Sequence, residues 1–191
     1  RVTEDEARSW LHATFDVSRE TWDQLEAYVT MLLTESTQQN LIAESTYDHV
    51  WARHIVDSAQ LLTLAPPAKN NESLWVDLGS GAGLPGVIVA ILSGYSVLMI
   101  EMRRKRVEFL QSVIDRLALS NARVFLGKVE RAEITHPAAV ISARAYAPME
   151  RLIPSAHHLT DFSTIWLLPK GQNHQNELAI AQQLWHCDAS T

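Results

Sequence analysis

Asp77 opens a glycine-rich segment, Asp-Leu-Gly-Ser-Gly-Ala-Gly, whose residue types suit the binding of a nucleotide-like ligand. Glycine has no Cβ atom, so Gly79, Gly81 and Gly83 allow a ligand to lie directly against the backbone. The segment follows a short apolar run and precedes a helical pattern that starts at Pro85. A glycine loop between a strand and a helix places its ligand at the carboxyl end of a parallel strand. The segment therefore predicts a cofactor site.

Two classes of ligand compete for this loop. Residues 81–86 match the dinucleotide pattern G-x-G-x-x-G, and Glu101 follows about 20 residues later, where its carboxylate can accept both ribose hydroxyls of either ligand. Asp77 favours a cationic ligand over a dinucleotide, because a carboxylate before the glycines repels a pyrophosphate and attracts a cation. S-adenosylmethionine carries a sulfonium and an amino group and has no phosphate. The loop thus favours S-adenosylmethionine as cofactor, with S-adenosylhomocysteine as product, over a dinucleotide or a turn that binds nothing.

Short apolar runs alternate with helical patterns from Ser73 onward. Several runs are apolar almost throughout, as expected of strands that are covered on both faces. The alternation predicts an α/β fold with a doubly wound, mostly parallel sheet. The pattern Asp-x-Gly-x-Gly-x-Gly at the end of the first strand is similar to that of Rossmann-like class I methyltransferases, which implies a core of that class. The predicted strands are 74–78, 96–100, 122–126, 138–141 and 164–168, and the predicted helices are 85–92, 103–117, 148–159 and 176–184.

The first third of the chain has a helical pattern instead. Ser18 is placed to cap a helix whose apolar face includes Leu25, Val29 and Leu32. A second helix is expected to begin after residue 45 or 46, and the polar residues 38–40 are expected to form a loop between the two helices.

Residues 65–71, with two prolines and two asparagines, form the clearest break in the regular pattern. We therefore predict an N-terminal helical extension over residues 1–72 that packs on a cofactor-binding core over residues 73–191. The length of 191 residues suits one compact unit of this kind.

The charge of the chain is unevenly distributed. The net charge is -6, which argues against a nucleic-acid partner for the chain as a whole. Residues 1–72 contain 12 acidic and five basic residues, whereas residues 73–191 contain ten acidic and 11 basic residues, four of them in the run Arg103-Arg104-Lys105-Arg106. Screening confines the field of each charge to roughly 8–10 Å, so a local basic patch can still bind phosphates. Charge alone leaves a nucleic-acid partner open.

Cysteine content and hydropathy bear on the compartment. Cys187 is the only cysteine, which excludes an internal disulfide framework and fits a reducing environment. The longest apolar stretch, Val87 to Leu92, is too short to span a bilayer, and no charged-then-apolar leader opens the sequence. We expect a cytoplasmic protein without a membrane partner.

Several segments, in the same order, make the chain similar to one family. The sequence resembles the bacterial 16S ribosomal RNA guanine-N7 methyltransferases, the RsmG or glucose-inhibited division protein B family, over about residues 20–185. Arg-His-Ile-Val-Asp-Ser at 53–58 is the most specific segment, since generic methyltransferases lack it. The segments that carry the resemblance are 40–42, 53–58, 76–86, 105–110, 142–145 and 168–171.

The resemblance implies roles for individual residues. It implies cofactor contacts at Gly79, Leu84, Val129, Glu130 and Arg144. Glu101 is a further candidate for cofactor contact because of its position at the end of a predicted strand. It also implies 16S ribosomal RNA of the 30S subunit as partner, and basic residues are the candidates for contact with that RNA. Members of the family end in two further strands, so the terminal strands of the sheet are expected to be absent from this chain or to lie outside it. The candidate RNA-contacting residues are Arg53, Arg103, Arg104, Lys105, Arg144 and Lys170.

The chemistry implied by the family explains why the sequence shows no acid–base pair. N7 of guanine has a free lone pair and no proton to lose, so its methylation needs orientation and no general base. His54 and Asp57 lie one helical turn apart and make a poor metal site without further ligands, so no metal is expected. We expect a monomeric S-adenosylmethionine-dependent methyltransferase that modifies N7 of a guanine in 16S ribosomal RNA. The alternatives are a methyltransferase of the same fold for a small molecule or protein, and a noncatalytic RNA-binding module of ribosome assembly.

Overall fold

The part of the chain that the structure describes forms a sheet of five strands, and every neighbouring pair is parallel. The computed structural model describes residues 2–69, 72–144 and 146–169, together with the single positions 175, 179 and 182. The strands lie in the order β3-β2-β1-β4-β5, which confirms the predicted doubly wound parallel sheet. Their bounds are β1 Leu74–Leu78, β2 Ser96–Glu101, β3 Ala122–Leu126, β4 Val140–Ala143 and β5 Ile165–Leu167.

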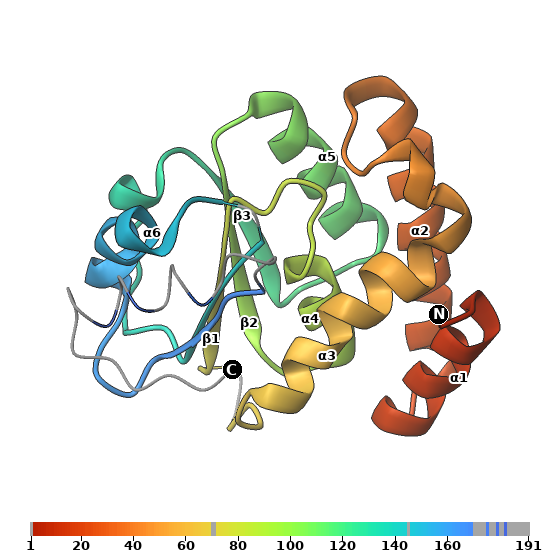
Figure 1. Cartoon of the computed structure of the whole chain (residues 1–191), viewed down its shortest axis with the longest axis horizontal. Helices are drawn as coiled ribbons and strands as arrows, with labels where there is room; N and C mark the ends of the chain where they lie inside the picture. The colour runs from red at the N-terminus through yellow and green to blue at the C-terminus, as the bar shows by residue number, and fades with distance from the viewer. Residues whose placement is uncertain are drawn as a thin grey trace.

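Helices cover both faces of the sheet, because successive strand side chains point to opposite faces. Trp75 and Met99 are buried on the face that packs against α4 and α5, whereas Val76 and Leu98 are buried on the face covered by α6. Figure 1 shows α6 on one side of the sheet and the other labelled helices on the opposite side. The helices of this core are α4 Gly86–Leu92, α5 Arg104–Arg116 and α6 Met149–Ala156, with 3-10 turns η3 Val129–Arg131 and η4 His157–Leu159.

The N-terminal region is helical, as predicted. The Ser18 hydroxyl accepts the Thr21 amide at 3.2 Å and caps the long helix. The predicted loop at 38–40 is wrong: the helix continues through Gln39 and ends at Asn40, which has a left-handed φ of 51°. The Gln39 amide bonds Glu35 one turn earlier, which holds these polar residues in helical conformation. The elements are α1 Glu4–Phe15, α2 Arg19–Gln39, the 3-10 helix η1 Glu44–His49, the π-helical turn η2 Trp51–Ile55 and α3 Val56–Leu64.

The predicted second helix is present but consists of three different windings. It begins as η1 at Glu44, two or three residues before the predicted start, widens into η2 and continues as α3. The Glu4 carboxylate accepts the amides of Trp51 and Ala52 at 3.1 and 2.9 Å, so α1 caps the widened turn. Single-turn π segments of this kind often occur at functional sites.

Some boundaries in the C-terminal half differ from prediction. β4 begins two residues later than expected, because the amide of Ala138 donates to the Leu159 carbonyl at 2.8 Å instead of joining the sheet. Helix α6 contains Pro154 and ends at Ala156, where the chain continues as η4. The helix predicted at 176–184 lies outside the continuous described ranges. Within those ranges, no helix combines the length and apolarity that a membrane span requires.

Candidate functional site

The glycine loop joins β1 to α4 at the carboxyl edge of the sheet. Gly79, Gly81 and Gly83 have φ angles of 64°, 55° and 90°, which other L-residues adopt only with strain. The Gly83 amide donates to the Ser80 carbonyl at 2.8 Å and closes a tight turn. The loop therefore requires glycine for its conformation at all three positions.

The three glycines differ in what surrounds them. A Cβ atom on Gly83 would lie 2.6 Å from a Val87 methyl carbon, and one on Gly79 would lie 2.7 Å from the Tyr146 ring. A Cβ atom on Gly81 would meet nothing closer than Arg106 at 3.5 Å. Gly79 and Gly83 thus lack a side chain at positions where other protein side chains pack directly against the backbone. Gly81 is the position where the backbone is open to a ligand.

Asp77 lies beneath this loop and is fully buried. Its Oδ2 atom accepts the Gly86 amide at 3.2 Å, and its Oδ1 atom accepts the Ser142 hydroxyl at 2.8 Å. Burial raises the pKa of Asp77 to about 6, although both of these hydrogen bonds lower it. Asp77 fixes the start of α4 and the neighbouring strand β4. Its predicted attraction of a cation would act in addition to this internal role.

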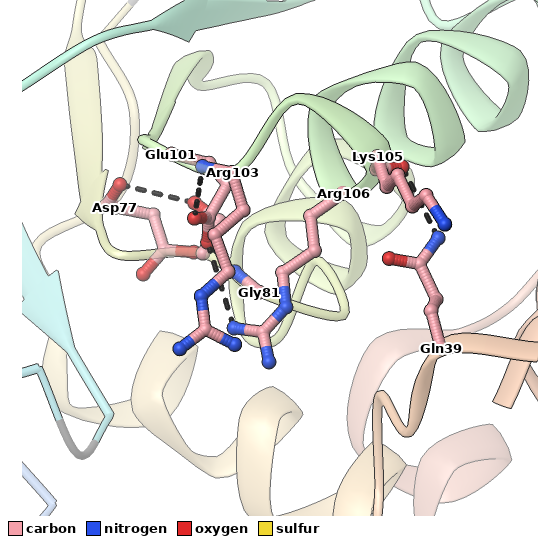
Figure 2. A network of polar contacts seen from close by, with 8 residues as sticks. Gln39, Asp77, Gly81, Glu101, Arg103, Lys105 and Arg106 are labelled. Atoms are coloured by element: carbon pink, nitrogen blue, oxygen red, sulfur yellow. Dashed lines mark hydrogen bonds and ion pairs between the residues drawn. The ribbon is translucent and has the colours of Figure 1, made fainter.

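Glu101 connects the glycine loop to the start of α5, as Figure 2 shows. Its Oε2 atom accepts the Gly81 amide at 2.9 Å, and its Oε1 atom accepts the Arg103 amide at 2.9 Å. Arg106 lies 3.9 Å away as an ion-pair partner. The buried carboxylate thus stands at the open part of the loop, at the edge where β1 and β2 end side by side.

The basic run that begins α5 divides into two parts. Arg103, Arg104 and Lys105 are exposed, whereas Arg106 turns toward Glu101. Gln39 reaches from α2 and donates to the Lys105 carbonyl at 3.1 Å (Figure 2). The three exposed cations stand at the start of α5, directly after β2, so they can attract an anionic partner to the carboxyl edge.

Arg144 follows β4, the strand on the other side of β1. Its guanidinium donates to the buried Ser58 hydroxyl at 3.4 Å, which brings the 53–58 segment to the same edge. Arg53 is exposed there, and the charges of Arg144 and Arg53 both lower the pKa of Asp57, against the dominant effect of burial, which raises it. The structure therefore joins two segments that are far apart in sequence.

His54 is held in one tautomer. The Thr46 hydroxyl donates to the Ala43 carbonyl at 2.6 Å, so it must accept from the His54 Nε2 atom, which lies 2.8 Å away. The Nδ1 atom is buried and has no hydrogen-bond partner among the described residues. Burial, followed by the charges of Arg144 and Arg53, lowers the pKa of His54 to about 4. In the described part of the chain, no group of acidic, His or Cys side chains could hold a metal ion.

The remaining predicted residues lie around the same edge or outside the described residues. Val129 is buried and Glu130 is exposed in η3, the turn that follows β3. Leu84 is buried at the end of the glycine loop, before Pro85 and α4. Lys170 lies outside the described residues.

Ser142, Arg106 and Tyr28 have roles in the site that the sequence did not predict. Ser142 bonds Asp77, Arg106 pairs with Glu101, and the Tyr28 hydroxyl on α2 donates to the Ala82 carbonyl of the glycine loop at 2.8 Å. The available signal for Tyr28 was a polar atom on the apolar face of a helix, because a buried phenol needs a partner.

A family model described as rRNA small subunit methyltransferase G matches residues 21–190. The chain belongs to this family, GidB. A member from Sphingopyxis alaskensis is 51% identical over 179 residues, which cover 94% of this chain and 76% of the relative. Another from Zymomonas mobilis is 45% identical over 194 residues, which cover 98% of this chain and 86% of the relative. Both relatives are named Ribosomal RNA small subunit methyltransferase G.

Solved structures agree with the family in fold. The C-terminal domain of precorrin-6Y C5,15-methyltransferase from Rhodobacter capsulatus has a TM-score of 0.54 and 20% identity, over 66% of this chain and 69% of that one. The glycopeptide N-methyltransferase MtfA in complex with S-adenosyl-L-methionine has a TM-score of 0.51 and 12% identity, over 60% of this chain and 53% of that one. At these identities the likeness concerns the fold, and it confirms the Rossmann-like methyltransferase architecture.

Proposed function

We propose that this protein transfers a methyl group from S-adenosylmethionine to N7 of a guanine in the 16S ribosomal RNA of the small subunit. The family match over residues 21–190 carries the proposal. The geometry of the carboxyl edge supports it, because an open glycine, a buried carboxylate and exposed cations lie next to one another there.

The cofactor fits the open part of the loop. The Gly81 backbone leaves room for a ligand, and Glu101 at the end of β2 is placed to accept hydrogen bonds from ribose hydroxyls. We assign Val129 and Glu130 to the adenine, because η3 follows the next strand along this edge. The proposed cofactor-contacting residues are Asp77, Gly79, Gly81, Gly83, Leu84, Glu101, Val129, Glu130 and Arg144.

The reaction needs placement and no proton transfer by the protein. The cofactor supplies an electrophilic methyl group: the N7 lone pair forms the new C–N bond as the S–CH3 bond breaks, and 7-methylguanine carries the positive charge. No residue therefore has to act as a general base, and the chain contributes mainly by orienting the two reactants. Arg144 follows β4 next to the loop, where it can contact both of them.

The RNA partner is bound through phosphates in this proposal. Arg53, Arg103, Arg104 and Lys105 are exposed at the carboxyl edge, and contacts of Arg and Lys with phosphates set affinity and position without reading sequence. Lys170 belongs to the same proposal from the family segment that contains it. We further propose that the protein acts as a monomer in the cytoplasm, which sedimentation analysis and fractionation of cells would check.

Methyl transfer to defined RNAs tests the proposal. The protein is incubated with methyl-labelled S-adenosylmethionine and with 30S particles, naked 16S RNA or 23S RNA from cells that lack it, and the nucleosides are analysed by mass spectrometry. We expect 7-methylguanosine from 30S particles or 16S RNA and none from 23S RNA. A protein that binds the cofactor and labels none of these RNAs, or that yields a different methylated nucleoside, would contradict the proposal.

A further inference from the structure

Helix α2 is attached to α5 near both of its own ends. The Gln24 side-chain amide donates to the Leu117 carbonyl at 2.9 Å, and the Gln39 side-chain amide donates to the Lys105 carbonyl at 3.1 Å. These two contacts join the C-terminal cap and the first turn of α5 to one helix of the N-terminal extension. The position of α2 relative to the catalytic edge is thus fixed at two separated points.

Tyr28 lies between these attachments and points from α2 into the core. It has no exposed surface, and its hydroxyl donates to the Ala82 carbonyl at 2.8 Å. The two residues are 54 positions apart in sequence. Burial raises the pKa of the Tyr28 phenol, so the group stays protonated and remains a donor.

The acceptor of this hydrogen bond is the central peptide of the glycine loop. Ala82 stands between Gly81 and Gly83, both of which have positive φ angles. Glycine on either side gives a peptide unusual rotational freedom, so its carbonyl direction depends on the partner that it finds. Glu101 holds the loop from β2 through the Gly81 amide, and Tyr28 holds it from α2 through the Ala82 carbonyl.

We propose that Tyr28 is a positioning residue for the cofactor. Its hydroxyl keeps the Ala82 peptide in the orientation that leaves the Gly81 backbone open. Helix α2 thereby contributes to cofactor binding. Tyr28 acts through the loop and touches neither reactant. The inference rests on the proposed use of S-adenosylmethionine, and it adds that the N-terminal extension sets cofactor affinity.

A pair of Tyr→Phe variants separates positioning from stability. Tyr28→Phe removes the hydroxyl and retains the ring. Tyr95→Phe is the matched control, since the Tyr95 ring is also buried and its hydroxyl donates to the Pro66 carbonyl, but Tyr95 precedes β2 at the opposite edge of the sheet. Both variants lose one hydrogen bond to a backbone carbonyl. Calorimetric titration with S-adenosylmethionine and thermal unfolding are measured for each.

We expect the Kd for S-adenosylmethionine to rise about tenfold in Tyr28→Phe and to stay within about twofold of wild type in Tyr95→Phe, with similar losses of Tm. Equal Kd values in the two variants would overturn the positioning role. A wild-type protein without measurable cofactor binding would instead overturn the proposed function on which the inference depends.

A second measurement uses the unaltered protein and covers the case in which Tyr28→Phe does not fold. Coupling between two sites is reciprocal, so a ligand on the loop must also stabilise the helix that holds the loop. We expect S-adenosylmethionine to slow amide hydrogen exchange in the loop and in residues 25–32 of α2 more strongly than in α1. Slowed exchange in the loop without any change in α2 would contradict the proposal.

Discussion

Burial disfavours the charged forms of Asp77 and His54. The pKa of the carboxyl group is therefore raised, and the pKa of the imidazole is lowered. Burial raises the pKa of Asp77 to about 6, and burial with the charges of Arg144 and Arg53 lowers the pKa of His54 to about 4. Both groups lie at the carboxyl edge, one beneath the glycine loop and one in the widened turn η2. Mildly acidic pH should consequently change both cofactor binding and stability.

His54→Gln tests the neutral state of the imidazole. Glutamine can still donate to Thr46 but cannot ionise. Unfolded histidine binds a proton below pH 6.5, whereas folded His54 does so only near pH 4, so wild type loses stability across this window as the pH falls. We expect wild type to lose on the order of 1–2 kcal/mol relative to His54→Gln between pH 6.5 and 4, after allowance for solvent screening at a half-buried group. Urea unfolding at several pH values measures this difference, and parallel stability curves would contradict it.

Asp77→Asn tests whether the buried charge contributes to cofactor affinity. At pH 5 only about a tenth of Asp77 groups with a pKa of about 6 remain ionised. If the carboxylate attracts the cationic cofactor, the wild-type Kd for S-adenosylmethionine should rise up to about tenfold between pH 7 and 5. The variant should bind more weakly at pH 7 and show no such rise. Calorimetry at each pH gives the Kd values, and the same pH dependence in both proteins would show that Asp77 acts only inside the protein.

Among the helices, α5 shows how one short segment serves two purposes. Its first turn sends Arg106 inward to Glu101 and leaves Arg103, Arg104 and Lys105 exposed. The ion pair ties the helix to the glycine loop, and the exposed cations are available to a phosphate backbone. The sequence run of four basic residues gave no indication of this division.

Arg104→Ala combined with Lys105→Ala tests the RNA-binding role of the exposed part of α5. Arg116→Ala is the matched control, because Arg116 is exposed in the last turn of the same helix. We expect the double variant to bind 16S RNA more weakly, with a slope of log K against log salt reduced by about 1 for each lost phosphate contact. Cofactor affinity should be unchanged. Filter binding at several salt concentrations gives the slope, and equal slopes in the double variant and the control would refute the role.

The sequence predicted those elements whose pattern is local. The Ser18 cap, the apolar face of α2 and the strand–glycine–helix segment depend on neighbouring residues, and the structure confirms them. The widened turn η2 depends on Glu4 from another helix, so no local pattern could indicate it. The predicted strand ends at 141, whereas β4 continues through Ala143, because polar Ser142 is buried in that strand through its bond to Asp77. A local sequence pattern cannot predict contacts with residues that are distant in the chain.

Across the whole molecule, one buried cluster joins the N-terminal helices to the sheet. It runs from Leu11 and Leu25 through Ile88 and Leu110 to Trp75 on β1. The division predicted near residue 72 therefore falls within a continuous core, and the two parts share their hydrophobic stabilisation. The site shares this dependence, since Tyr28 and Ser58 come from the N-terminal part and Asp77 and Arg144 from the rest.

We accordingly predict that the chain unfolds as one cooperative unit. Hydrogen exchange across a urea series should give the same midpoint for peptides from α2 and from β1, because opening either one exposes the shared cluster. Mass spectrometry of peptides resolves the two regions. Exchange of α2 at clearly lower urea than β1 would show that the N-terminal extension is an independent unit.

The buried contact between Trp75 and Ser142 has a spectroscopic consequence. The indole Nε1 atom donates to the Ser142 hydroxyl at 2.8 Å, and this hydroxyl donates to Asp77 at 2.8 Å. A fluorophore thus lies one hydroxyl away from the carboxylate beneath the glycine loop. With the other five of the six tryptophans replaced, the emission of Trp75 would follow the ionisation of Asp77. The fold carries its own optical reporter for the site, and no external label is required.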